Sequence, residues 1–248
     1  MSTLILALAA GAVIGLALGA LGGGGSVLAV PALIYLLGFT PAAATTSSLI
    51  IVTATSATAL YAHATAGNVR WKTGALFAAV GIPPAIAAAT LAIRVPEAVL
   101  TAAFAAIALL AALAMFKAPP PDQQPRAVRA ARAAGTGAGL GAVTGFLGVG
   151  GGFLAVPALV AVLGLRMRAA VGTSLLVISV NSLAALLARA GAHTPLNWAV
   201  IAPFTGAAIL GAWDGKRLAA KISGPALQRT FASVLLAVAA LMVTDALH

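Results

Sequence analysis

Two glycine clusters that each open a short apolar segment are the residues best suited to chemistry in this sequence. Residues 22–38 read GGGGSVLAVPALIYLLG and residues 148–164 read GVGGGFLAVPALVAVLG, 126 residues apart and identical at 11 of 17 positions. The first N–H groups of a helix lack internal partners and carry partial positive charge, and glycine lets a ligand approach them closely. Each cluster therefore suits the binding of an anion at a helix N-terminus.

The candidate backbone donors are Gly24, Gly25 and Ser26 in the first half and Gly150, Gly151 and Gly152 in the second. Within a bilayer, water cannot satisfy such donors cheaply, so a ligand is one explanation for them. Close helix packing through small residues is the other. Replacing Gly25 and Gly151 by alanine is expected to separate the two, because a packing role loses stability first and a ligand role loses binding first.

Small hydroxyl residues open the third apolar segment of each half, and they are the candidate side-chain ligands. A hydroxyl can donate to an oxyanion without bringing a fixed charge, although Ser and Thr also bond neighbouring helices in membranes. The candidates are Thr46, Ser47, Ser48, Thr173 and Ser174, with Asn181, the repeat counterpart of Thr55, as a further polar candidate. Pro31 and Pro157 lie at matched positions inside the short segments, where each is expected to break the helix beside the site or only to kink it for packing.

Ionisable residues are scarce, which excludes several classes of function. The four acidic residues avoid the segment centres, so a cation pump or metal transporter lined with acids is not expected. Asp214 is expected to pair with Lys216 or Arg217, and His63 to lie at the membrane interface rather than to relay protons. No HExxH motif, Ser/His/Asp set or paired carboxylates are present, and cysteine is absent, so we expect no enzyme, no metal site and no cofactor.

The composition indicates an integral membrane protein. Hydrophobic residues make up 62% of the 248 residues and charged residues 7%, with a mean hydropathy of +1.10, whereas a soluble domain carries about a quarter charged residues. Long continuous apolar runs favour an all-α polytopic bundle over a barrel. The net charge of +10 lies in short loops, so it predicts topology rather than a nucleic-acid partner.

Five apolar segments fall in each half. They cover residues 3–21, 26–38, 42–65, 73–93 and 96–116, then 134–147, 152–164, 169–188, 197–213 and 224–245. The second segment of each half would form only about 20 Å of helix, against a hydrocarbon core of about 30 Å. The first two segments are therefore expected to form one broken unit, either a re-entrant hairpin or two tilted helices. The predicted domains are a membrane repeat over 1–116, a cytoplasmic linker over 117–133 and a second membrane repeat over 134–248.

The distribution of basic residues predicts the orientation of the two halves. Placing the linker in the cytoplasm puts 12 of the 14 Lys and Arg inside and leaves Arg94 and Arg189 outside. Equivalent loops of the two halves then have opposite charge character. The halves are therefore expected to be inverted repeats with their short, broken helices at the interface, as in many secondary transporters.

The paired motifs GGGGSVLAVPAL and GVGGGFLAVPAL, followed by ATTSSL and VGTSLL, resemble those of the TauE/SafE sulfite exporter family over essentially the whole chain. The motif positions that carry this resemblance are Gly22, Gly24, Gly25, Pro31, Thr46, Ser47 and Ser48, then Gly148, Gly150, Gly151, Pro157, Thr173 and Ser174. The chain departs from the pattern at Thr46, where the second half has Gly172, so the pocket could differ on its two sides.

The resemblance implies a multi-pass protein of the bacterial or archaeal plasma membrane. It also implies a permease for sulfite, thiosulfate or an organosulfonate, which agrees with a pocket of amides and hydroxyls. The expected function is secondary transport of such an anion by alternating access, with the lipid bilayer as surroundings and self-association into a homo-oligomer left open. The alternatives are a non-transporting membrane scaffold and a cation-coupled permease for another small solute.

Overall fold

The computed structural model describes residues 2–92, 95, 97–117, 130–147, 152–188 and 196–246, and this part of the chain is almost entirely helical with no strand. The first half contains α1 (Ser2–Leu21), α2 (Gly24–Pro31), the π-helix η1 (Ala32–Leu36), α3 (Pro41–Thr65), α4 (Trp71–Ala92) and α5 (Glu97–Lys117). The second half contains α6 (Ala130–Leu147), α7 (Gly152–Pro157), the π-helix η2 (Ala158–Val162), α8 (Met167–Ala188), α9 (Trp198–Lys221) and α10 (Gly224–Ala246). The all-α prediction is confirmed.

The helices follow the predicted segments, with two differences. The helix α9 continues through residues 214–221, which lie between the predicted segments 197–213 and 224–245, and α6 begins at Ala130, inside the predicted linker. The order of elements is the same in both halves, down to the π-helices at 32–36 and 158–162. Sequence repetition is therefore matched by repetition of local structure.

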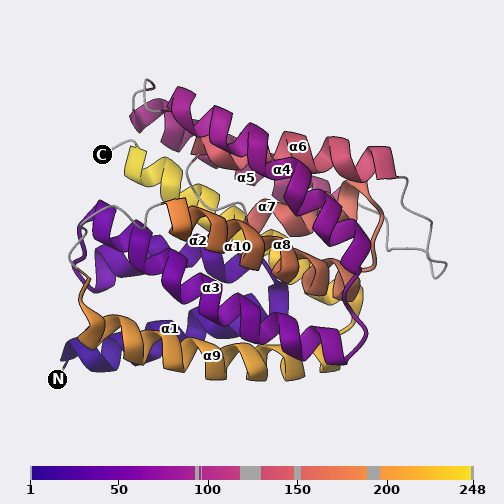
Figure 1. The fold of residues 1–248 in the computed structure, drawn as a ribbon. Helices are drawn as coiled ribbons and strands as arrows, with labels where there is room; N and C mark the ends of the chain where they lie inside the picture. The colour runs from indigo at the N-terminus through magenta and orange to yellow at the C-terminus, as the bar shows by residue number, and fades with distance from the viewer. Residues whose placement is uncertain are drawn as a thin grey trace.

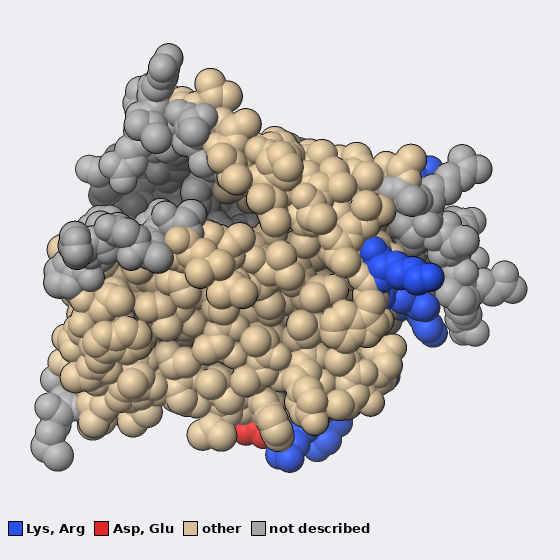
Figure 2. Space-filling view, in the orientation of Figure 1, with Lys and Arg blue, Asp and Glu red and all other residues tan. Residues whose placement is uncertain are grey.

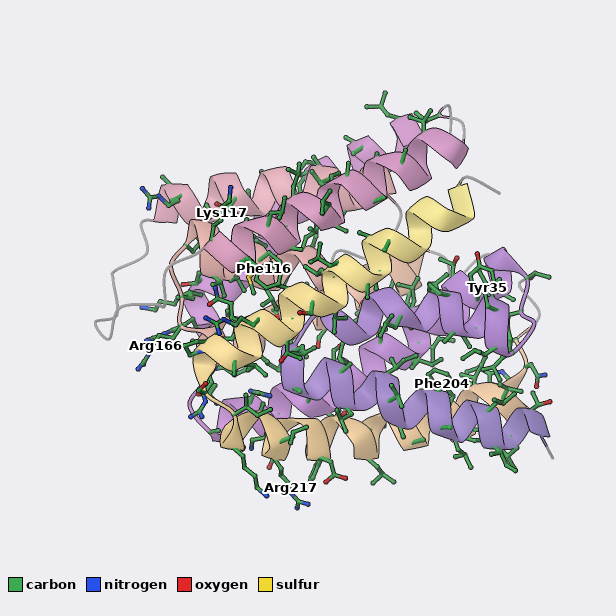
Figure 3. The ribbon with its side chains drawn as sticks, turned by 180° about the vertical axis from the view of Figure 1, so that it is seen from behind. Tyr35, Phe116, Lys117, Arg166, Phe204 and Arg217 are labelled. Carbon is green, nitrogen blue, oxygen red and sulfur yellow. The ribbon has the colours of Figure 1, made fainter. Side chains whose placement is uncertain are left out.

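Among the described residues, three helices are long and apolar enough to cross a membrane, over Thr3–Leu21, Ala43–Thr65 and Met167–Leu187. The helices run side by side along a common direction (Figure 1), and charged side chains on the face seen in Figure 2 are confined to its lower edge and right side. The side chains of Lys117, Arg166 and Arg217 lie toward one end (Figure 3). A largely uncharged face with basic residues toward one end is the surface expected of a protein that lies in a bilayer.

Glycines hold α1 and α9 in backbone contact. The facing pairs are Gly11 with Phe204, Gly15 with Ala208, and Gly19 with Ala212. A Cβ atom added at Gly15 would lie 2.0 Å from the carbonyl oxygen of Ala208, so no larger residue fits without separating the helices. Because the residue numbers rise together, α1 and α9 run parallel.

The helices α4 and α6 are joined in the same way. Gly137 faces Phe77 and Gly141 faces Gly81, where an added Cβ at Gly141 would lie 2.0 Å from the Gly81 carbonyl oxygen. The numbers again rise together, so α4 and α6 run parallel. Because α6 is the repeat counterpart of α1, and α9 that of α4, each half supplies one member of both pairs.

At the centre of the bundle, α3 packs against α8 in the antiparallel sense. The hydroxyl of Ser179, within α8, donates to that of Ser56 in α3 at 2.9 Å, while Gly172 near the start of α8 lies against Asn68, just beyond the end of α3. This contact is also between counterparts, since α8 follows α3 by 126 residues in the repeat.

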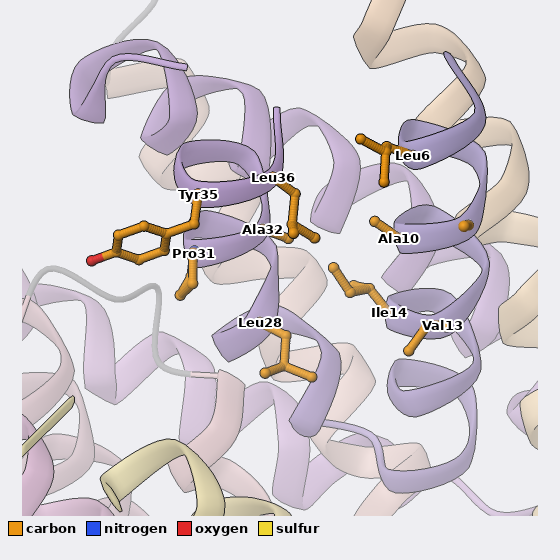
Figure 4. Close-up of a pocket in the computed structure, with 10 residues that line it drawn as sticks. Leu6, Ala10, Val13, Ile14, Leu28, Pro31, Ala32, Tyr35 and Leu36 are labelled. Atoms are coloured by element: carbon orange, nitrogen blue, oxygen red, sulfur yellow. The ribbon is translucent and has the colours of Figure 1, made fainter. Parts of the chain in front are cut away.

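The segment formed by α2 and η1 turns back along α1 (Figure 4). Gly25 lies against Ile14 and Leu18, while Leu36 and Leu6 line the same groove further along. The 8 residues of α2 and the 5 of η1 are about 20 Å long. The first two predicted segments therefore form a helical hairpin whose returning arm is the short one.

Candidate functional site

The N-terminus of α2 follows a tight glycine turn. Gly22 has φ of +78°, in the left-handed region that glycine favours, and its N–H donates to the Leu18 carbonyl oxygen at 2.8 Å. Gly23 is the N-cap residue of α2, and it provides no side chain to accept from the first amides of the helix. The helix thus begins at Gly24 with amide donors that no N-cap side chain satisfies.

This turn lies against the second half of the chain. A Cβ atom at Gly22 would be 2.5 Å from Ser174 Oγ, 3.1 Å from Val171 Cα and 3.2 Å from Val156 Cγ2. The helices α2 and α7 also contact each other. The predicted short helices therefore do meet, and the hydroxyl of Ser174 lies beside the glycine turn of the first half.

Several predicted donors fall partly or wholly beyond the described residues. Gly150 and Gly151 lie outside them, and Gly152 is the first residue of α7. Ser26 belongs to α2, and its side chain is not described. Of the six predicted backbone donors, the structure therefore places Gly24, Gly25, Ser26 and Gly152 within the two short helices.

Gly25 has a packing role. A Cβ atom there would lie 2.4 Å from the Ile14 carbonyl oxygen and 2.9 Å from the Leu18 amide nitrogen, both in α1. A Gly25→Ala variant is therefore expected to lose stability whatever the function of the protein. The expectation that this substitution separates packing from ligand binding is wrong, and another variant is needed.

The hydroxyl candidates are buried, but they differ in their partners. Ser48 Oγ donates to the Thr45 carbonyl oxygen and Ser174 Oγ to that of Val171, each at 2.8 Å. Thr46 is also buried and has a partner. These bonds satisfy the hydroxyl donors locally and leave the oxygen lone pairs for a second contact.

Thr173 and its counterpart Ser47 have different surroundings. Thr173 Oγ1 accepts the Arg70 N–H at 3.0 Å, which ties α8 to the start of α4. Ser47 has an exposed fraction of 0%, and its Oγ has no hydrogen-bond partner among the described residues. Interhelical bonding thus explains Thr173, whereas Ser47 keeps a buried hydroxyl that a ligand could satisfy.

A band of polar residues lies where α3 crosses α8. Asn181 Oδ1, Thr55 Oγ1 and Thr53 Oγ1 are buried atoms without a hydrogen-bond partner in the described part of the chain, and the Ser56–Ser179 bond lies beside them. Unsatisfied polar groups are costly in an apolar environment, so a bound ligand or water is one way to satisfy them. Of this band, Asn181 was named as a candidate from the sequence, whereas Thr53, Ser56 and Ser179 were not, although their spacing along each helix places them near one face.

Pro31 and Pro157 end α2 and α7, and the π-helices η1 and η2 follow them directly. Pro31 has φ of −55° and ψ of −42°, so the chain remains helical through it. The predicted break is therefore a change of helical pitch, in keeping with the missing proline N–H donor.

Charged side chains of the described residues lie at the bundle end rather than in the site. Asp214 Oδ1 pairs with Arg217 Nη1 at 3.4 Å on the exposed surface, as predicted. The Arg168 guanidinium donates to the carbonyl oxygens of Ala220 and Ile222 at the end of α9. In the described part of the chain, the buried residues around α2, α3, α7 and α8 therefore present dipoles and hydroxyls without a carboxylate.

His63 is buried within the bundle, with an exposed fraction of 3%, and its position at the depth of the membrane interface stays a prediction. Its Nε2 lies 3.1 Å from the Gly19 carbonyl oxygen in α1. This partner lies 44 residues away in the sequence, and no local pattern could have indicated it.

The groove between α1 and the α2–η1 arm does not suit an anion. It has a volume of about 450 Å³, and its lining side chains come mostly from Leu, Ile, Val and Ala, with Pro31 and Tyr35 (Figure 4). Val13 and Tyr35 are exposed on this face. An open apolar groove on a membrane-facing helix pair is a surface for hydrocarbon.

Comparison with known proteins agrees with the resemblance read from the motifs. The family model "Sulfite exporter TauE/SafE" matches residues 7–242. Two relatives from Xylella fastidiosa, in strains 9a5c and Temecula1 / ATCC 700964, are each described as a "Probable membrane transporter protein". Each is 34% identical over 245 residues, which cover 96% of this chain and 94% of the relative. No solved structure matches the chain. The chain therefore belongs to the TauE/SafE family.

Proposed function

We propose that this member of the TauE/SafE family is a secondary transporter that moves a small sulfur-containing anion, such as sulfite, thiosulfate or an organosulfonate, across the plasma membrane. The observation that carries the proposal is the N-terminus of α2. It has no side-chain cap, and the glycine turn before it is buried against Ser174 of the other half. The family description and the relatives described as transporters support the same conclusion.

The proposed site binds its anion through dipoles rather than through a fixed positive charge. The N-terminus of each short helix carries about half a unit of positive charge, and hydrogen bonds to an ionised group are worth roughly 1.5–3 kcal/mol. Ser47 would donate to the anion, and the lone pairs of Ser48 and Ser174 would orient water or a protonated oxygen. Such a site favours an oxyanion over a metal cation, because the buried described residues include no carboxylate.

We further propose that the two halves are inverted repeats. The short turn between α3 and α4 reverses the chain, so α4 runs opposite to α3. The helix α3 runs with α1, since His63 near the end of α3 bonds Gly19 near the end of α1. Yet α9, the counterpart of α4, runs parallel to α1. Opposite directions of the counterparts α4 and α9 support inversion, which makes two opposed access routes to one site a natural consequence.

The basic end of the bundle is proposed to face the cytoplasm. Lys117, which begins the linker, shares that end with Arg166 and Arg217 (Figure 3). This arrangement supports the orientation expected from the positive-inside rule.

Flux of radiolabelled sulfite or thiosulfate into proteoliposomes is the direct test. Thermal unfolding of the purified protein across a series of sulfur oxyanions and sulfonates is the matching binding test, because a ligand that binds the native state raises its stability. Chloride and phosphate serve as control anions in both. Saturable sulfur-anion flux with ligand-induced stabilisation is expected, and the absence of both for every sulfur anion would refute the proposal.

A non-transporting membrane scaffold is the second candidate, favoured by the packing of Gly25 against α1. Ser47→Ala separates the two functions where Gly25→Ala cannot, since the Ser47 hydroxyl has no partner in the described structure to lose. A transporter should lose anion affinity in this variant while remaining folded. A scaffold should show no anion binding in either form.

A further inference from the structure

His63 is the one ionisable side chain that is buried among the described residues. It lies near the end of α3, while Thr65, two residues further on, is exposed. An ionisable residue inside a membrane segment is expensive, and such residues commonly serve ion pathways or proton relays. The proposed anion site does not include His63.

The hydrogen bond of His63 defines where a proton could bind. A backbone carbonyl can only accept, so Nε2 must carry a hydrogen and donate it to the Gly19 oxygen over 3.1 Å. In the neutral imidazole, Nδ1 then holds the lone pair, and Nδ1 is buried without a partner in the described structure. The ring is thus held by one nitrogen and presents the other as an unoccupied base.

This base lies beside the proposed anion site. Gly19 is in the last turn of α1, and the Gly22 N–H bonds the Leu18 carbonyl oxygen in the same turn. Gly22, just before α2, lies in turn against Ser174 of α8. A proton on His63 would therefore place a positive charge about one helical turn from the glycine turn that precedes the anion-binding amides.

A proton on His63 would help to neutralise a divalent anion in the site. The N-terminus of α2 supplies about half a unit of positive charge. A divalent anion such as thiosulfate would retain about one and a half units of uncompensated negative charge, which is unfavourable in a low-dielectric interior. One imidazolium would neutralise most of the remainder, and neutral histidine would restore the empty site after release.

Other ionisable groups around His63 are few. On α9, the positive charge of Lys216 disfavours a second positive charge on His63, and Asp214 and Arg217 form an exposed pair. Among the other elements packed on α3, α1 and α2 carry no ionisable side chain, η1 carries the exposed Tyr35, and α8 carries Arg168 in its first turn. The remaining ionisable side chain near His63 on α3 itself is the exposed Tyr61. The described carboxylate on these elements, Asp214 of α9, is exposed and paired with Arg217, so no buried described carboxylate competes with His63 for the proton.

We propose that His63 couples transport to protons, taking up one proton at Nδ1 with each divalent anion and releasing it with that anion. The inference rests on the proposed transport function. The N–H bond at Nδ1 forms on loading and breaks on unloading, while the Nε2–H bond to Gly19 persists. Proton and anion therefore move together in the same direction.

The test is thiosulfate accumulation in proteoliposomes with the membrane potential clamped and the pH gradient varied. Thiosulfate is preferred to sulfite because it stays ionised near neutral pH and adds no protonation of its own. One coupled proton changes the accumulation ratio about tenfold per pH unit. In His63→Gln, whose amide can still donate to Gly19, thiosulfate should equilibrate without responding to the gradient. The other two histidines, His193 and His248, provide the matched control, since their replacement by glutamine should leave the response intact.

A second measurement keeps the inference testable if His63→Gln folds poorly. Calorimetric titration of the wild-type protein with thiosulfate, in buffers of different ionisation enthalpy, should show uptake of about one proton per bound anion. Thiosulfate flux that ignores the pH gradient in the wild type, a retained gradient response in His63→Gln, or binding without proton uptake would each overturn the proton coupling and leave the transport function standing. Absence of flux and binding for all sulfur anions would instead refute the transport function and the coupling with it.

Discussion

The contact between Gly22 and Ser174 can be tested with a matched pair of glycine variants. Gly22 and Gly38 both have positive φ, +78° and +69°, so alanine at either position costs about 1–2 kcal/mol in backbone strain. A Cβ at Gly38 would have nothing within 4 Å, whereas a Cβ at Gly22 would meet Ser174 Oγ at 2.5 Å and Val171 Cα at 3.1 Å. The difference between the variants therefore isolates the contact between the two halves.

The magnitude follows from what must move. Overpacking against backbone costs about 1–3 kcal/mol, and displacing the Ser174 hydroxyl also weakens its bond to Val171. Gly22→Ala should therefore lose about 1–3 kcal/mol more stability in detergent than Gly38→Ala. Because the start of α8 shifts away from the tip of α2, thiosulfate affinity should fall about tenfold, which corresponds to about 1.4 kcal/mol. Gly38→Ala should bind thiosulfate like the wild type.

Two outcomes would refute this reasoning. Equal destabilisation of Gly22→Ala and Gly38→Ala would mean that Gly22 does not pack on α8. Greater destabilisation of Gly22→Ala with wild-type thiosulfate affinity would mean that the junction between α2 and α8 is a packing contact and not part of the anion site.

Three further variants test other parts of the structure. Gly141→Ala should destabilise the protein by about 1–3 kcal/mol, because its Cβ would meet backbone in α4. Gly139→Ala is the control, since a Cβ there would have nothing within 4 Å. Equal unfolding temperatures of the two variants would contradict the α4–α6 contact. Ser47→Ala should leave the unfolding temperature unchanged or raise it, since it removes a buried hydroxyl that has no partner among the described residues. It should weaken sulfur-anion binding about tenfold. An unchanged anion affinity would exclude Ser47 as a ligand. Ser56→Cys combined with Ser179→Cys should form a disulfide that stops anion flux until it is reduced. Each single variant serves as a control. Full flux in the oxidised form would show that α3 and α8 need not move apart.

Much of the fold could be predicted because membrane-spanning segments can be recognised from the length and hydropathy of their apolar runs. The repeat spacing of 126 residues also predicted the sequence position of each helix in one half from that of its counterpart in the other. The end of α9 could not be predicted in this way. Its last turns contain Lys216, Arg217 and Lys221, whose charge suggested a loop, but long basic side chains can extend from a continuing helix toward water.

The candidate site was predictable in kind and less so in detail. The paired motifs predicted that the glycine turn and Ser174 belong to one site, and in the structure Gly22 lies against Ser174. It could not separate Thr173, whose hydroxyl accepts from Arg70, from Ser47, whose hydroxyl has no described partner, because repeat counterparts look alike in sequence. The burial of His63 was likewise hidden, since its partner is a backbone carbonyl rather than a recognisable side chain.

The helix contacts also constrain how alternating access can work. The pairs α1–α9 and α4–α6 join one helix from each half through glycine contacts that leave no room for adjustment. The two sequence halves therefore cannot rock against each other as intact bodies without separating both pairs. The contact between α3 and α8 is different, because it includes the Ser56–Ser179 hydrogen bond and buried polar atoms without a partner among the described residues, which water or substrate can satisfy. A movement that keeps α1 with α9 and α4 with α6, and opens along α3 and α8, costs the least packing, and under the proposed transport function it would expose the polar band to the anion.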